Sequence, residues 1–229
     1  MQSELERSKV LFGNEGLERL RNSKVIIFGV GGVGGYALEV IARSGVGTIT
    51  IVDADKIETT NINRQLLALH STIGRTKVEV AEKRVLEINP DCKVKAIPMF
   101  YLPENADEID ISEYDYVVDC IDTVTAKVEL IRRCNELGKP IISSMGAGNK
   151  MDATAFKVAD IYQTTMDPLA KAVRKKCKEL GVKRLKVVFS TEQPTSHDAD
   201  FIASNAFVPA AMGVIVGGEV VKDIVKTGN

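Results

Sequence analysis

The sequence predicts a single α/β domain in which helices cover both faces of a mostly parallel sheet. Short apolar runs alternate with helical patterns between residues 24 and 145, as in strand–helix–strand units. Beyond residue 150 this alternation ends, and apolar runs at 153–161 and 185–190 predict two further strands. No linker separates the two parts. We therefore expect one domain over residues 1–229, with a core at 1–150 and an extension at 151–229 that adds antiparallel strands to the sheet.

Composition narrows the class of protein. The 229-residue chain is 45% apolar, which is enough for a proper core. Its net charge of -1 argues against a generally basic nucleic-acid-binding protein but leaves local basic patches open. No basic start leads into an apolar run, and the apolar stretch at 201–216 contains Ser204, Asn205 and Pro209. We therefore predict a cytoplasmic protein without a secretory signal or a membrane span. The four cysteines lack zinc or redox spacing and are expected to be reduced.

Each expected element has a local reason. The core strands are apolar or alternating runs, at residues 25–28, 48–52, 93–97, 114–120 and 141–145. The helices carry apolar residues at helical spacing, at residues 1–22, 36–43, 78–88, 124–137 and 207–225. Asn89-Pro90 and Gly138-Lys139-Pro140 end two of these helices. Asp167-Pro168 opens one more helix, with proline in its first turn.

A glycine-rich turn follows the first strand. Gly29, Gly31, Gly32 and Gly34 remove Cβ atoms between this strand and the next helix. Such a turn offers backbone N–H groups and the positive end of a helix dipole to a phosphate. Asp53, at the end of the second strand, can accept hydrogen bonds from ribose hydroxyls. The order of strand, turn, helix, strand and acid predicts a nucleotide site in a Rossmann-like sheet; the alternative is a merely tight turn.

The segment after Asp53 is rich in side chains that could meet a nucleotide. Asn61 and Arg64 follow the strand at the edge where open sheets bind ligands, and the planar Arg64 fork suits phosphate oxygens. Lys77 stands at a helix start, where a cation opposes the helix dipole unless an anion lies beside it. We also place Asp55 and Gln65, from the same segment, in the expected nucleotide site.

An acidic pair follows the fourth strand. Asp122 falls just past the end of this strand, and its carboxylate is a candidate ligand for magnesium or ribose. Magnesium is usually held by one or two carboxylates together with nucleotide phosphates. Asp119 is expected instead to orient the amides of the loop.

The helix opened by Asp167-Pro168 is strongly basic, and its cations include Lys171, Arg174, Lys175 and Lys178. A run of charges is usually a solvated helix face, and that explanation stays open here. The other explanation is an anionic macromolecule, because clustered cations release counterions when they meet phosphates. Residues 191–200 show no periodicity and predict a mobile loop, and neither His70 nor His197 receives a role.

Four motifs in the core carry a family resemblance. FGVGGVGGY, VDADKIETTNINRQ, GRTKVEVA and VVDCIDTV resemble the adenylating superfamily that includes ubiquitin-activating enzymes and the ThiF and MoeB proteins. The resemblance implies attack of a carboxylate on the α-phosphate of ATP with release of pyrophosphate. It also implies that Arg64 and Lys77 bind the phosphate chain and that Asp122 helps to place Mg²⁺. Arg7 resembles an arginine that reaches the partner's site from an N-terminal arm, which implies a homodimer.

The C-terminal third is similar to one branch of this superfamily. SMGAGNKMDAT, VADIYQTTMDPLAKAVRK, LKVVFSTEQP and FVPAAMGVIVGGEVVKDI resemble the branch that dehydrates threonylcarbamoyladenosine in tRNA. This branch is understood to adenylate the threonyl carboxylate of the modified adenosine next to the anticodon and to cyclise it with loss of AMP. The resemblance makes tRNA the expected substrate and the basic helix its docking site. It also leaves open a cysteine desulfurase or a sulfur-acceptor protein as a partner.

Three other functions stay open at the level of sequence. An activator of a ubiquitin-like sulfur-carrier protein would share the adenylation site, although the paired zinc cysteines of such enzymes are missing here. An NAD-dependent dehydrogenase would use the same glycine turn and Asp53, but would leave Arg64, Lys77 and Asp122 unexplained. A nucleotide-binding scaffold without turnover is the third alternative.

Overall fold

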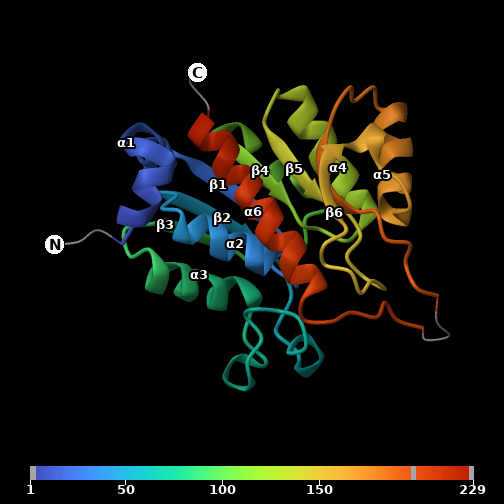
Figure 1. The fold of residues 1–229 in the computed structure, drawn as a ribbon, viewed down its shortest axis with the longest axis horizontal. Helices are drawn as coiled ribbons and strands as arrows, with labels where there is room; N and C mark the ends of the chain where they lie inside the picture. The colour runs from blue at the N-terminus through green and yellow to red at the C-terminus, as the bar shows by residue number, and fades with distance from the viewer. Residues whose placement is uncertain (1–3, 197–199, 227–229) are drawn as a thin grey trace.

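A computed structural model of the protein describes residues 4–196 and 200–226 (Figure 1). Its strands form one seven-stranded sheet in the order β3-β2-β1-β4-β5-β7-β6, in which β6 alone runs antiparallel to its neighbour. The strands are β1 (Lys24–Phe28), β2 (Thr48–Val52), β3 (Lys93–Ile97), β4 (Tyr116–Asp119), β5 (Ile141–Ser144), β6 (Phe156–Asp160) and β7 (Lys186–Ser190). The predicted α/β class, with a C-terminal part that extends the sheet, is therefore confirmed.

Six α-helices are found in the described part of the chain. They are α1 (Glu6–Asn22), α2 (Gly34–Arg43), α3 (Lys77–Ile88), α4 (Val124–Glu136), α5 (Pro168–Glu179) and α6 (Val208–Lys226). The differences from prediction lie at the ends of elements. The fourth strand is shorter than predicted because Tyr114 follows the short 3₁₀-helix Ile111–Glu113. The first helix contains a break at Gly13, whose φ of 70° is not helical.

Alternation along each strand divides the core between the two faces of the sheet. Val25 and Ile27 of β1 pack with residues of α1, α2, α3 and α6, whereas Ile26 and Phe28 pack with residues of α4. α5 covers the remainder of the second face, over β5 and β7. Helices therefore lie on both sides of the sheet, as Figure 1 shows. None of the helices in the described ranges has the length and apolar character needed to cross a membrane.

Two glycines allow α6 to lie against α2. A Cβ atom on Gly213 would overlap the carbonyl oxygen of Val33, and one on Gly217 would lie 2.8 Å from the carbonyl oxygen of Ala37. Gly218, on the same helix, has no neighbouring atom within 4 Å of its Cβ position. The contact matters for the cavity described below, because the start of α6 contributes to its wall.

We predict that Gly213→Ala lowers the free energy of unfolding by about 3 kcal/mol, because the added methyl group must push α6 away from the α2 backbone. Gly218→Ala is the matched control and should raise it by about 0.5–1 kcal/mol, because alanine favours the helix. Urea titrations of both variants measure the difference. Equal stabilities would contradict the close packing of the two helices.

Candidate functional site

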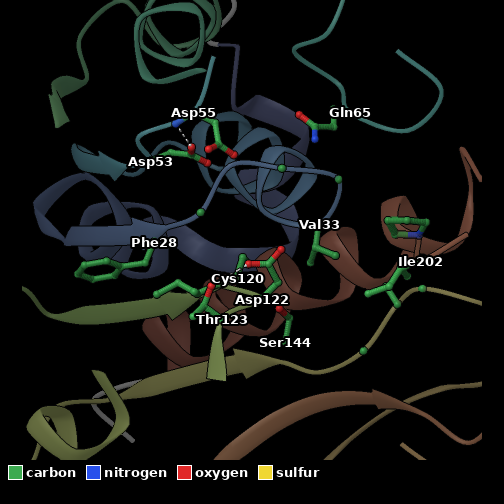
Figure 2. A pocket seen from close by; sticks show the side chains of 18 of the residues that line it. Phe28, Val33, Asp53, Asp55, Gln65, Cys120, Asp122, Thr123, Ser144 and Ile202 are labelled. Atoms are coloured by element: carbon green, nitrogen blue, oxygen red, sulfur yellow. Dashed lines mark hydrogen bonds between the residues drawn. The ribbon is translucent and has the colours of Figure 1, made fainter. Parts of the chain in front are cut away.

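A cavity of about 790 Å³ lies at the carboxyl ends of the central strands. The structure brings ten of the predicted nucleotide-site residues to its lining: Gly29, Gly31, Gly32, Asp53, Asp55, Asn61, Arg64, Gln65, Lys77 and Asp122. Figure 2 places Asp53, Asp55 and Gln65 on one side of the glycine turn and Cys120, Asp122, Thr123 and Ser144 on the other. The residues converge because parallel strands end at the same edge of the sheet.

The glycine turn requires glycine at two positions. Gly29 has φ of 83°, and a Cβ atom there would lie 2.8 Å from the carbonyl oxygen of Cys120. A Cβ atom on Gly34 would overlap the carbonyl oxygen of Gly29. Gly34 does not line the cavity, so its observed part is the close approach of α2 to the turn. No side chain caps the start of α2, and this end of the helix is suited to an anion.

Asp53 is fixed by the turn that it faces. One carboxylate oxygen accepts from the Val30 N–H at 2.8 Å and the other from the Asp55 N–H at 2.9 Å. Burial raises the pKa of Asp53, against the opposing effect of the nearby Lys77 charge. The side chain is therefore oriented before any ligand binds.

Lys77 is almost fully buried and is paired with acids of the same site. Its Nζ lies 2.6 Å from Asp55 and 3.9 Å from Asp53. The expected anion at the start of α3 is thus supplied by the protein itself. Asp55 is half exposed, so it is the partner that a bound polyphosphate could replace.

Arg64, Asn61 and Gln65 line the same cavity from the segment after β2. Arg64 donates to the Thr60 carbonyl oxygen at 3.0 Å and to the Asn63 side chain at 2.8 Å, and its stem lies beside Gly32. Asn61 accepts from the Glu58 N–H at 3.1 Å and so shapes the turn. The buried Oε1 of Gln65 has no hydrogen-bond partner in the structure. This oxygen lies on a cavity-lining residue and can accept from a ligand.

The acids after β4 have different surroundings. Asp119 is fully buried and accepts from Lys127 Nζ at 2.7 Å, from the Ser143 hydroxyl and from the Ile121 N–H at 3.1 Å. The predicted bond to a loop amide is therefore present, but the buried ion pair with Lys127 was missed. The sequence feature that could have indicated this ion pair is the position of Lys127 on the apolar face of the helix predicted at 124–137. Asp122 is exposed at the cavity, and the described residues contain no cluster of three or more possible metal ligands.

The sequence analysis also did not predict a second wall of the cavity, formed by residues 146–150 and 167–169 together with Pro194, Ile202 and Ser204. Asp167 caps α5 through the Ala170 N–H at 2.9 Å, accepts from the Gly146 N–H at 3.0 Å and pairs with Lys150 at 3.2 Å. Both charged side chains are buried, and both residues line the cavity. Asp167-Pro168 predicted the start of the helix, but no local sequence feature indicated that Lys150 would pair with Asp167.

The chain between β7 and α6 crosses this second wall. Asn149, with φ of 58°, exchanges two hydrogen bonds with Ala203, at 2.8 and 2.7 Å, and its carbonyl oxygen accepts from the Thr195 N–H. Pro194, Ile202 and Ser204 consequently line the cavity. Of the predicted mobile loop at 191–200, residues 191–195 are thus tied to the wall, while residues 197–199, including His197, lie outside the described residues.

The other predicted functional residues lie outside the cavity. Arg7 is exposed on α1 and does not line the cavity of its own chain. α5 begins at the cavity and carries Lys171, Lys175 and Lys178 exposed along its length. Arg174 is half-buried and donates to the Thr164 carbonyl oxygen at 2.8 Å, so its guanidinium is already engaged.

The fold and the cavity define an α/β protein in which a glycine turn lines one cavity together with two buried or half-buried cations, Arg64 and Lys77. The ThiF family model matches residues 5–229, and the chain belongs to the ThiF family. Its sequence is 44% identical to a tRNA threonylcarbamoyladenosine dehydratase of Bacillus subtilis, over 99% of this chain and 96% of that protein. It is 37% identical to the Escherichia coli dehydratase, over 80% of this chain and 71% of that one.

Solved structures agree with the sequence comparison. The E. coli dehydratase TcdA in complex with AMP has a TM-score of 0.90 and 32% identity, with 98% of this chain and 96% of that chain covered. The same enzyme in complex with ATP has a TM-score of 0.87 and the same identity and coverage. An adenylyltransferase and sulfurtransferase of Drosophila yakuba, MOCS3, is 38% identical over 62% of this chain and 30% of its own length.

We predict that Asp55→Asn tightens the binding of inorganic tripolyphosphate by up to about tenfold, because Lys77 no longer has a competing carboxylate. Calorimetry without divalent cations measures this affinity. Asp107→Asn is the matched control, since Asp107 is an exposed acid paired at 2.7 Å with Arg133 and lies outside the cavity lining. Unchanged or weaker binding in Asp55→Asn would show that the Lys77–Asp55 pair is not exchanged for phosphate.

Proposed function

We propose that this chain is an ATP-dependent tRNA threonylcarbamoyladenosine dehydratase. The observation that carries the proposal is similarity to such dehydratases over the whole chain, including the second wall of the cavity. The adenylyltransferase and sulfurtransferase MOCS3 matches only 62% of this chain. A sulfur-carrier activator is therefore not favoured.

The proposed reaction has two steps. An oxygen of the threonyl carboxylate bonds to the α-phosphorus of ATP, and the bond to the departing pyrophosphate breaks. The carbamoyl nitrogen or oxygen then bonds to the acyl carbon, a proton leaves the carbamoyl group, and AMP departs. The modified nucleoside thereby loses one water.

The chain's own residues suit the first step by neutralising charge. A carboxylate and a triphosphate repel each other, and Arg64 and Lys77 lie at the cavity where that repulsion would be offset. Lys77 would pass from Asp55 to the phosphate chain, while Asp53 would hold the ribose. A carboxylate needs no general base to act as a nucleophile.

ATP fits the cavity on two observations of this structure. The cavity is open at Gly31, where an added Cβ atom would have only Gln65 Nε2 within 4 Å, at 3.8 Å. The buried Oε1 of Gln65 has no hydrogen-bond donor within the protein and could accept from ATP. Asp122 is the carboxylate that would hold Mg²⁺ together with the phosphates. Bound Mg²⁺ would supply charge neutralisation of the departing pyrophosphate.

Cyclisation within the substrate requires no enzyme thiol, and the cysteines are consistent with that. Burial raises the pKa of Cys92 and Cys177 to about 11 and that of Cys120 and Cys134 to about 12. All four thiols are therefore protonated at neutral pH and are poor nucleophiles.

Two surfaces outside the cavity belong to the proposal. Arg7 could act only at the site of a second copy, and the neighbouring Val10 and Leu11 are 85% and 82% exposed, which favours a homodimer through α1. The exposed cations of α5, Lys171, Lys175 and Lys178, would meet the tRNA backbone, with Arg174 supporting the helix.

We expect tRNA carrying threonylcarbamoyladenosine to lose one water from that nucleoside when incubated with the protein, ATP and Mg²⁺. Mass spectrometry of the digested nucleosides measures the loss, and reactions without ATP or with NAD are the controls. No loss of water, together with pyrophosphate exchange stimulated by a carrier protein ending in Gly-Gly, would refute the proposal in favour of the sulfur-carrier alternative.

We expect Arg64→Ala and Lys77→Ala each to lower adenylate formation on the order of 10²-fold or more, because each removes a charge that offsets the phosphates. Single-turnover release of pyrophosphate measures the rate. Arg75→Ala and Lys83→Ala are exposed controls outside the cavity and should retain the wild-type rate. Near-normal rates in both cavity variants, with folding intact by circular dichroism, would overturn the assignment.

A further inference from the structure

Several exposed large apolar residues lie on the cavity lining or close in sequence to residues that line it. Phe100 and Ile202 line the cavity and are nevertheless 65% and 75% exposed. Phe201 and Phe207, 71% and 47% exposed, belong to the segment that carries Ile202 to the start of α6. The chain contains seven phenylalanines, and these three are the exposed ones. We call Phe100, Phe201, Ile202 and Phe207 the rim.

The rim residues are held by two different parts of the sheet. Phe100 follows β3, at the edge beyond β2, whereas Ile202 packs on Gly148 in the segment after β5. A Cβ atom on Gly148 would overlap the Ile202 side chain. Two of the rim residues, Phe100 and Ile202, therefore lie on the cavity lining itself.

Backbone hydrogen bonds hold the rim without burying its side chains. Asn105 accepts from the Leu102 N–H at 2.8 Å and donates to the Phe100 carbonyl oxygen at 2.7 Å. Asn205 accepts from the N–H groups of Phe207 and Val208, at 3.1 and 2.9 Å, and donates to the Lys150 carbonyl oxygen at 2.9 Å. The fold thus leaves the large apolar side chains of the rim exposed.

We propose that the rim stacks the unpaired bases that flank the modified adenosine. This inference rests on the proposed function, in which one nucleoside of an RNA loop enters the cavity. Its neighbours in the strand must then lie at the mouth. Unpaired bases stack on exposed aromatic rings, and stacking tolerates any base sequence.

Charge near the rim fits an RNA strand. Lys56 lines the cavity and is exposed, and Lys171 is exposed in the first turn of α5, just after the cavity-lining Pro168 and Leu169. These cations can meet phosphates while the rings meet bases. A second copy of this chain is the competing occupant of an apolar surface, and the test below separates the two.

The test is steady-state dehydration of a 17-nucleotide anticodon stem–loop that carries threonylcarbamoyladenosine. Phe201→Leu and Phe100→Leu keep an apolar side chain but remove the ring, and each should raise KM about tenfold with kcat and the affinity for ATP unchanged. Phe201→Tyr and Phe100→Tyr keep the ring and should retain the wild-type KM. Leu137→Ala, an exposed apolar control 51% exposed after α4, should also retain it.

A second comparison identifies the stacked base. A stem–loop with an abasic site next to the modified adenosine should raise KM for the wild type but should cause little further change in the leucine variant that lost the same contact. Equal KM values for the leucine and tyrosine variants would overturn the inference. So would a change in oligomeric state in the leucine variants, measured by sedimentation, that accounts for the change in KM.

The two proposals fail in different ways. If the wild type does not dehydrate the stem–loop or the full tRNA, the proposed function fails and the inference fails with it. If the wild type turns over and the ring-deleting variants match it, only the inference fails.

Discussion

The close approach of α2 to the end of β1 is the constraint on which the site depends. Gly34 and Gly29 touch where any side chain would collide, and this contact sets the glycine turn directly beneath the start of α2. The Val30 N–H in that turn binds Asp53, which ties the end of β2 to the same point. Gly213 and Gly217 then allow α6 to pack on the other side of α2. One backbone contact therefore positions the helix dipole, the acid and a wall of the cavity together.

Two lysine–carboxylate pairs line the cavity, and a third lies outside its lining. Lys77 is paired with Asp55, Lys127 with Asp119, and Lys150 with Asp167. The last two pairs are buried, and buried pairs add little to stability because desolvation offsets their attraction. Their carboxylates also accept backbone N–H groups of Ile121 and Gly146, so they fix the loops after β4 and β5. The Lys77–Asp55 pair differs because Asp55 is half exposed, which makes it the pair that a ligand can open.

The sequence alone predicts those parts of the site that depend only on the order of the strands. Asp53, Arg64 and Asp122 each come after a strand of a parallel sheet, so their meeting at one edge is a consequence of topology. The sequence did not identify the partner of Lys77. A lysine at a helix start predicts a nearby anion, but only the structure shows that this anion is Asp55. Lys150 and Asp167 are separated by an edge strand, and their contact depends on how α5 docks on β5 and β7. Strand ends were the least predictable, since Tyr114 is as apolar as the strand it precedes.

The cavity has two walls, which the proposed function would use for different tasks. The wall built from the glycine turn, Asp53, Arg64 and Lys77 has the features that a triphosphate needs. The second wall is built from residues 146–150 and 167–169 together with Pro194, Ile202 and Ser204. Because Asn149 and Asn205 hold this wall through backbone bonds, the exposed side chains upon it are free to vary without loss of the fold. Under the proposed function, we infer that the second wall and its rim select the carboxylate, while the first wall activates it.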